Sequence, residues 1–104
     1  MDVHEAAALL ERGEGVAIDV REPREWQAGR MPGSRHVPLG ELGTRIDELP
    51  RATTIVAVCR SGNRSALVTR ALRDAGFPAE NLDGGLQAWT RAGLPLEPSD
   101  GRVA

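Results

Sequence analysis

Residues 54–65 read TIVAVCRSGNRS, and this stretch decides the fold of the chain. The β-branched run at 54–58 predicts a strand that ends at Cys59, the only cysteine of the sequence. A short polar loop with a glycine follows, and the apolar spacing after it predicts a helix. In an open α/β sheet, ligands bind beyond the carboxyl ends of the strands. We therefore expect an α/β fold with its site at Cys59.

The rest of the chain alternates between helical and strand patterns in the same way. Helical spacing of apolar residues predicts helices that begin near Val3, Pro23, Leu42, Leu67 and Leu86. Short apolar runs predict strands at 16–20, 35–37 and 54–58 and a brief one at 81–83. Strands that alternate with helices form a mainly parallel sheet. The prediction is a sheet of four to five short strands with helices on both faces.

Length and composition indicate one globular domain, expected over residues 1–98, with a frayed tail at 99–104. A net charge of −2 argues against a nucleic-acid surface. No apolar run reaches membrane-spanning length, and the first residues do not resemble a signal peptide. We therefore expect a cytoplasmic protein. One cysteine excludes an internal disulfide and any multi-cysteine metal site, and neither a metal nor a cofactor is expected.

The position of Cys59 favours a reactive thiol over an inert core cysteine. The helix expected after the loop would aim its N–H groups and the positive end of its dipole at the sulfur. Helix N-termini and cationic neighbours lower a cysteine pKa from about 8.5 to roughly 3.5–7.5. A lone cysteine is more often a small core residue. Here it stands at the end of its apolar run beside Arg60, which favours the thiolate, the nucleophilic form.

Charged residues near the loop admit more than one interpretation. Arg60 directly follows the thiol and is expected to contact an anionic substrate. Arg64 either binds that anion or clamps Asp19 or Glu25, and the sequence leaves both open. Asp19 ends a predicted central strand, where a buried carboxylate needs a partner such as Arg21.

The other aromatic and polar residues that might have a function are expected to be structural. We expect core anchors (Trp26, Trp89), ordinary surface or capping residues (His4, His36) and a solvated helix face (Glu22, Arg24, Glu25).

Four segments, in order, resemble the rhodanese family of sulfurtransferases and its single-domain members in particular. They are residues 18–21 with 25–26, residues 29–34, the loop 59–65, and residues 82–85 with Trp89 and 93–95. Together they cover nearly the whole chain. The sequence departs from the family at Arg30, Ser34 and His36, outside the loop. The resemblance implies a rhodanese-like three-layer α/β/α fold.

The resemblance also implies a sulfur-transfer cycle. Cys59 would attack the outer sulfur of thiosulfate, release sulfite and hold a persulfide. Cyanide or a thiol, that of a protein included, would then accept this sulfur. Such an attack needs a thiolate and a leaving group of low pKa. The substrate-binding residues implied are those of the loop, whose successive N–H groups can surround an anion: Arg60, Ser61, Gly62, Asn63, Arg64 and Ser65. Asp19 and Arg21 are expected to support them.

Two other functions remain as alternatives. A persulfide carrier or interaction module in sulfur trafficking would keep the same loop without turning over thiosulfate. Phosphatases that resemble this fold place five residues between cysteine and arginine, whereas Cys59 and Arg64 enclose four. The shorter loop forms a tighter ring and favours a sulfur atom over a phosphoryl group.

Overall fold

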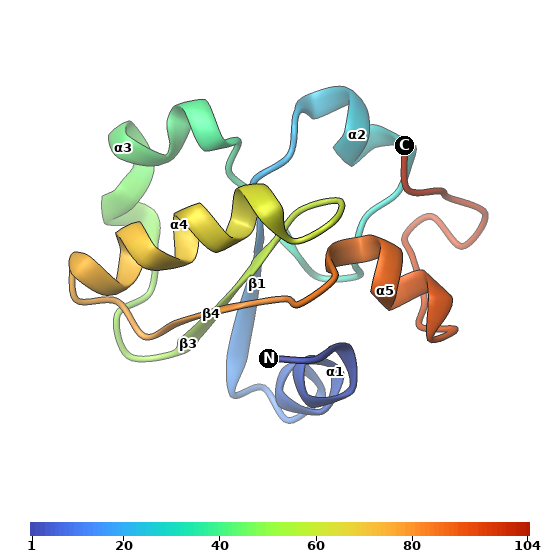
Figure 1. Cartoon of the computed structure of the whole chain (residues 1–104), viewed down its shortest axis with the longest axis horizontal. Coiled ribbons are helices and arrows are strands. Elements are labelled where there is room, and N and C mark those ends of the chain that lie inside the picture. Colours follow the sequence, from blue (N-terminus) through green and yellow to red (C-terminus); the bar gives the residue numbers. More distant parts are fainter.

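The computed structural model describes all 104 residues as one parallel sheet flanked by helices (Figure 1). Its four strands lie in the order β2-β1-β3-β4, and every neighbouring pair is parallel. The strands are β1 (Gly15–Asp19), β2 (Arg35–His36), β3 (Thr54–Val58) and β4 (Ala79–Asn81). The α-helices are α1 (Val3–Glu11), α2 (Pro23–Ala28), α3 (Leu42–Arg45), α4 (Asn63–Asp74) and α5 (Gly85–Arg91).

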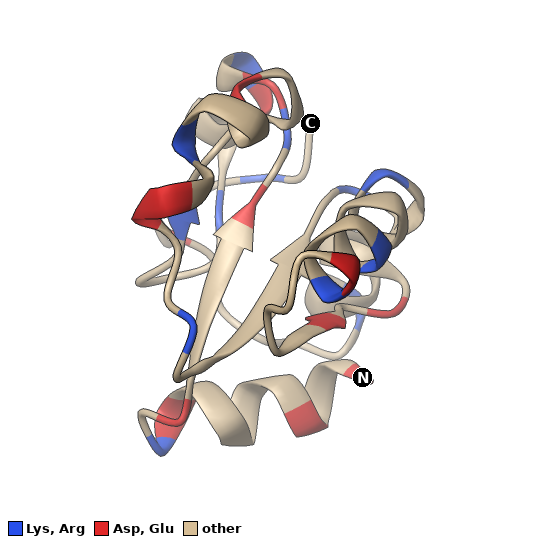
Figure 2. Ribbon diagram, turned by 90° about the vertical axis from the view of Figure 1, so that its left-hand side faces the viewer, with Lys and Arg blue, Asp and Glu red and all other residues tan.

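Strand β3 divides its side chains between two hydrophobic clusters. Ile55, Ala57 and Cys59 belong to the cluster that contains residues of α3 and α4. Val56 and Val58 belong to the cluster that contains residues of α1 and α5. Successive strand residues point to opposite faces, so each face of the sheet is covered by one pair of helices. Figure 2 shows the central strands nearly free of charge, as a sheet buried on both faces requires. The fold is the predicted three-layer α/β/α arrangement.

Most predicted elements lie within one or two residues of their expected places, but the α-helix expected at 42–49 is confirmed only in its first half. The chain there forms a 3₁₀ turn at Leu39–Glu41, the short helix α3 and a second 3₁₀ turn at Ile46–Glu48. Gly43, within the expected helix, disfavours a continuous α-helix. Apolar residues three apart, such as Ile46 and Leu49, lie on one side of a 3₁₀ turn.

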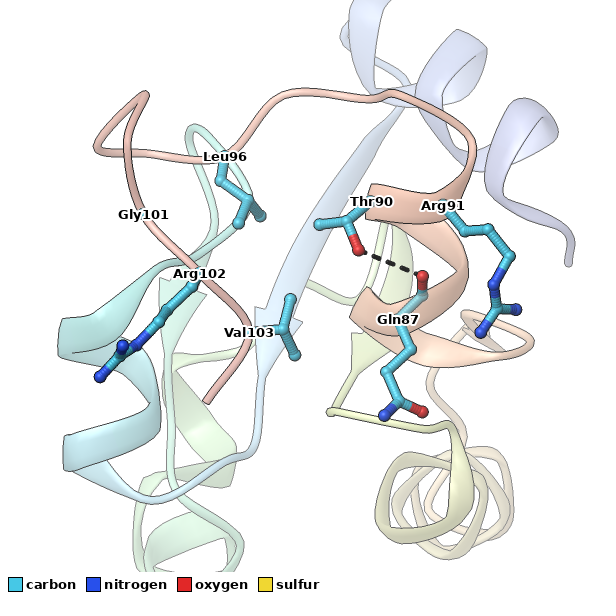
Figure 3. A pocket seen from close by; sticks show the side chains of 7 residues that line it. All are labelled: Gln87, Thr90, Arg91, Leu96, Gly101, Arg102 and Val103. Atoms are coloured by element: carbon cyan, nitrogen blue, oxygen red, sulfur yellow. Dashed lines mark hydrogen bonds between the residues drawn. The ribbon is translucent and has the colours of Figure 1, made fainter.

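The C-terminal segment contacts the domain, although we expected residues 99–104 to fray from it. The Arg102 N–H donates to the Ala28 carbonyl at 2.9 Å. A Cβ atom at Gly29 would lie 2.6 Å from the Arg102 nitrogen, so glycine permits this approach. The segment runs beside α5, and a cavity of about 500 Å³ between them is lined by Thr90, Leu96 and Val103 among others (Figure 3). None of the helices combines the length and the hydropathy of a membrane span.

Replacement of a buried leucine of α4 is expected to destabilise the fold. Leu72 is completely buried, so Leu72→Ala leaves a cavity and lowers the free energy of unfolding by about 2–5 kcal/mol. Leu67→Ala on the same helix is the control, because Leu67 is 58% exposed and its loss costs about 0.5 kcal/mol or less. Urea unfolding of both variants measures the difference. Equal losses would contradict the packing of α4 described above.

Candidate active site

The loop after β3 surrounds the sulfur of Cys59 with hydrogen-bond donors. Cys59 is completely buried. Its Sγ accepts hydrogen bonds from the Gly62 N–H at 3.1 Å, the Ser65 N–H at 3.4 Å and the Ser65 hydroxyl at 3.2 Å. Gly62, with a φ of 98°, turns the chain into α4. The left-handed conformation at this position favours glycine. The loop thus closes around one atom, at the carboxyl edge of the sheet.

These donors favour the thiolate form of Cys59. Burial is the largest single effect on the thiol and raises its pKa. The Ser65 hydroxyl and the N–H groups of Ser65, Gly62 and Ser61 act against burial, and together they hold the pKa of Cys59 below its ordinary value. The N-terminus of α4 also directs the positive end of its dipole at the loop. Cys59 is therefore buried in the core, as an inert core cysteine would be, but its sulfur accepts hydrogen bonds from polar groups of the loop.

Helix α5 holds the backbone of the loop through hydrogen bonds to its carbonyl groups. The N–H of Leu86 donates to the Cys59 carbonyl at 2.9 Å, and that of Gln87 donates to the Arg60 carbonyl at 3.0 Å. A Cβ atom at Gly85 would lie 2.5 Å from the Arg60 carbonyl oxygen, so only glycine fits there. The sequence predicted a tight turn at this glycine pair but gave no signal that the turn touches the loop.

Arg64 forms a bidentate ion pair with Glu25 of α2. The two hydrogen bonds measure 2.7 and 2.8 Å. Of the two interpretations of Arg64, the structure shows the clamp on Glu25. The bonds from Arg64 outweigh burial and lower the pKa of Glu25 to about 2. The prediction that Glu25 lies on a solvated face is wrong, because this side chain is buried. Its bond from the Glu22 N–H at 3.0 Å holds it at the start of α2.

Asp19 and Arg21 form a second ion pair next to the loop. Both side chains are completely buried. Arg21 donates to the Asp19 carboxylate through Nε at 3.0 and 3.1 Å and through Nη2 at 2.8 Å. Nη2 also donates to the Gly29 carbonyl at 2.8 Å. Because Asp19 is in register with Val58, this pair lies at the carboxyl edge where β3 leads into Cys59.

The remaining loop residues form the exposed rim of the site. Arg60, Ser61 and Asn63 are all exposed. Arg60 has no acidic partner, and its Nε donates to the Ala104 carbonyl at 3.1 Å. The loop therefore contributes buried donors through Gly62 and Ser65 and an accessible cation through Arg60.

The two tryptophans differ in their surroundings. Trp89 is a core anchor, as predicted, and its Nε1 donates to the Pro95 carbonyl at 2.7 Å. Trp26 is only half-buried, so the same prediction is wrong for it. Its ring stacks on His36 with centroids 4.7 Å apart. His36 is likewise not an ordinary surface residue, since its Nε2 lies 2.8 Å from the Arg21 carbonyl oxygen.

One residue that sequence reasoning missed is Asn81, at the end of β4. Its Oδ1 accepts a hydrogen bond from the Ser65 hydroxyl at 2.6 Å. Its Nδ2 donates to the Gly62 carbonyl at 3.2 Å. No motif or spacing in the sequence indicates either contact, because both depend on the pairing of β4 with β3.

Comparisons with known proteins agree on the kind of domain. The family model described as "Rhodanese-like domain" matches residues 2–92. A sulfurtransferase of Allochromatium vinosum is 33% identical over 94 residues, which cover 89% of this chain and 88% of that protein.

Longer proteins contain a similar domain. The HTH-type transcriptional regulator Rv0324 of Mycobacterium tuberculosis is 41% identical over 96 residues, covering 88% of this chain and 42% of the regulator. The crystal structure of a thiosulfate sulfurtransferase from Pseudomonas aeruginosa is similar with a TM-score of 0.86 and 34% identity. That match covers 98% of this chain and 20% of the other. The chain thus spans less than half of either protein.

The ion pair of Glu25 with Arg64 predicts a pH-dependent contribution to stability. The pKa of Glu25 in the folded chain is about 2, against an ordinary value of 4.5. The contribution is therefore fully present above about pH 4.5 and is lost as the pH falls towards 2. Glu25→Gln should lower the free energy of unfolding by about 1–2 kcal/mol at neutral pH, since Arg64 is partly solvated.

Urea unfolding of Glu25→Gln and the unchanged protein between pH 2 and 6 (roughly the range in which carboxylates titrate) measures this contribution. The two should converge at the acid end. Glu11→Gln, which removes an exposed glutamate without an ion pair, is the control. A stability difference independent of pH would contradict the ion pair.

Contact between α5 and the loop predicts a specific effect of Gly85→Ala. The new Cβ would displace the Arg60 carbonyl, pull the loop donors away from Sγ and raise the pKa of Cys59. Gly93→Ala is the matched control, because Gly93 has a φ of 78° but nothing within 4 Å of a Cβ. It should cost only about 1 kcal/mol of backbone strain and leave the thiol unchanged. The pH midpoint of iodoacetamide alkylation reports the thiol, and equal midpoints in the two variants would argue against the contact.

Proposed function

Because the chain belongs to the rhodanese-like family, whose chemistry is sulfur transfer, we propose that it is a thiosulfate sulfurtransferase acting through a Cys59 persulfide. The observation that carries this proposal is the ring of donors around Cys59 Sγ. Such a ring stabilises a sulfur anion and requires no general base to generate it. Resemblance to the sulfurtransferase of Allochromatium vinosum and to the Pseudomonas aeruginosa enzyme supports the choice of reaction and of donor.

In the first half-reaction, the Cys59 thiolate attacks the sulfane sulfur of thiosulfate. A bond forms between Sγ and that sulfur, and the sulfur–sulfur bond of thiosulfate breaks. Sulfite leaves with the electron pair, and the persulfide keeps one negative charge. Exchange of this kind is fast when the leaving group has a low pKa, as sulfite has.

In the second half-reaction, a nucleophilic acceptor attacks the outer sulfur of the persulfide. Cyanide is converted to thiocyanate in this step, and a thiolate is converted to a new persulfide. The bond between Sγ and the outer sulfur breaks, and its electron pair restores the Cys59 thiolate. Charge balances in both halves, so no cofactor, oxidant or reductant is required.

We assign the loop residues complementary parts in this cycle. The N–H groups of Ser61, Gly62, Asn63, Arg64 and Ser65 face the transferred sulfur. Arg60, exposed and free of acidic partners, contacts the dianionic donor. Arg64 positions the start of α4 through Glu25. Asp19 and Arg21 support the neighbouring strand end. Because Sγ is buried, we expect a donor to approach it from the exposed rim of the loop.

A second candidate is a persulfide carrier or interaction module that accepts sulfur from a protein and does not turn over thiosulfate. This candidate is favoured by the similarity to the "Putative sulfur carrier protein YrkF" of Bacillus subtilis, which is 38% identical over 74 residues, or 40% of its length. The carrier function would use the same ring of donors, so the two candidates differ only in donor and turnover. In both candidates, we expect a thiol of a partner protein to be able to accept the sulfur.

The test is the mass of the intact protein after exposure to thiosulfate, together with thiocyanate formed from thiosulfate and cyanide. We expect the mass of one added sulfur atom and steady turnover. Cys59→Ser should fold normally and show neither, because no other thiol exists in the chain to hold a persulfide.

Comparison of thiosulfate with 3-mercaptopyruvate then identifies the preferred donor, and we expect thiosulfate. Persulfide formation without turnover would favour the carrier over the enzyme. Turnover by Cys59→Ser would contradict the covalent mechanism. Hydrolysis of an aryl phosphate by the unchanged protein would indicate a phosphatase instead.

A further inference from the structure

The Ser65 hydroxyl lies between two acceptors and has one proton to donate. Cys59 Sγ is 3.2 Å away on one side, and Asn81 Oδ1 is 2.6 Å away on the other. Both are within hydrogen-bonding distance, and a hydroxyl rotates to suit the stronger acceptor. Ser65 is completely buried, so water does not supply a third partner. The two acceptors therefore compete for one proton.

Surrounding groups fix the orientation of the Asn81 amide. Its Nδ2 faces two acceptors, the Gly62 carbonyl at 3.2 Å and Asp83 Oδ1 at 3.5 Å. A flipped amide would place Oδ1 against both of these oxygens, which is electrostatically unfavourable. Asn81 thus presents Oδ1 to Ser65 as an acceptor and has no donor to offer that hydroxyl.

We propose that Asn81 is a positioning residue that gives the Ser65 hydroxyl a second hydrogen-bonding position, occupied whenever Cys59 Sγ is uncharged. When Sγ is a thiolate, the hydroxyl turns from Asn81 to the sulfur. When Sγ carries a proton, or the outer sulfur of a persulfide, the hydroxyl returns to Asn81. No proton is exchanged, since only the Cβ–Oγ bond of Ser65 rotates. The persulfide part of this inference rests on the proposed function; the thiol and thiolate part does not.

Removal of Asn81 and removal of Ser65 should shift the ionisation of the Cys59 thiol in opposite directions. Asn81 stabilises the hydroxyl in the state with a neutral sulfur, so its removal should favour the thiolate. Ser65 stabilises the thiolate, so its removal should favour the thiol. If Asn81 acts only through Ser65, the first effect must disappear once Ser65 is absent.

The charged groups around the site would not produce the same changes in the ionisation of Cys59. Arg64 of α4 is the cation near Sγ, and it is held by Glu25 of α2 and lies close to Asp19 of β1. Arg60 lies on the exposed rim, and Asp83 is the carboxylate next to the Asn81 amide. None of these residues contacts the Ser65 hydroxyl. All of them stay unchanged in the variants below.

The experiment is a double-mutant cycle on the pH midpoint of Cys59 alkylation by iodoacetamide. Ser65→Ala should raise the midpoint. Asn81→Leu, close in size but unable to accept a hydrogen bond, should lower it by roughly half a unit to one unit, as expected from one hydrogen bond. The double variant should match Ser65→Ala alone. Glu80→Gln is the control, because Glu80 lies beside Asn81 on β4 and pairs with Arg73 away from the loop.

Two results would overturn the inference. A raised midpoint in Asn81→Leu would show that Asn81 only braces the loop. An Asn81→Leu effect that persists in the Ser65→Ala background would show that it acts through the Gly62 carbonyl. If Asn81→Leu does not fold, Asn81→Ser, whose shorter side chain does not reach Ser65, tests the same directions. Alkylation uses no sulfur donor, so a chain that gives these midpoints but takes no sulfur from thiosulfate would refute the proposed function alone.

Discussion

A sulfur that is both buried and easily ionised is the constraint on which the rest of the structure depends. Burial opposes the thiolate, and donors placed directly against Sγ reverse that effect. To supply them, the chain turns back on itself within a few residues of β3. The left-handed Gly62 begins α4 at the point where its first N–H groups reach the sulfur. The glycine at 85 lets α5 hold the loop carbonyls from the other side. Each of these features places or holds a hydrogen-bond donor against Sγ, where it stabilises the negative charge of the thiolate.

Two ion pairs extend this constraint beyond the loop. Glu25 takes up the charge of Arg64, and Asp19 takes up that of Arg21. Both arginines are thereby ordered and no longer free to bind an anion through both guanidinium edges. Of the two arginines in the loop, only Arg60 keeps an exposed guanidinium without an Asp or Glu partner. The site therefore separates positive charge that stabilises the loop from positive charge that is open to solvent. This separation explains why two arginines so close in the sequence have different surroundings.

Local patterns in the sequence predicted the sheet and the position of the thiol, but not the contacts between distant segments. Strand β3 coincides with the predicted strand because its continuous, β-branched apolar run reflects burial on both faces. Glu25 was one of two partners considered for Arg64, but the sequence could not decide the contact because the two residues are 39 positions apart. Asn81 drew no attention for a related reason, since its contact with Ser65 exists only after β4 pairs with β3. The break in the helix at 42–49 was missed because apolar spacing there fits two kinds of helix.

The geometry of the ring also bears on how a persulfide would be held. A sulfur–sulfur bond is about 2 Å long, so the outer sulfur of a persulfide lies farther along the loop than Sγ does now. The negative charge moves outward with it, and Sγ becomes neutral. The N–H groups that now point at Sγ, those of Gly62 and Ser65, belong to the same segment 59–65. Its other N–H groups can therefore meet the charge at the new position without a change of fold. The Ser65 side chain, by contrast, is fixed to α4 and does not follow. A second acceptor for its proton is then what keeps the persulfide state from leaving a buried hydroxyl unpaired, and Asn81 is the group in place to provide it.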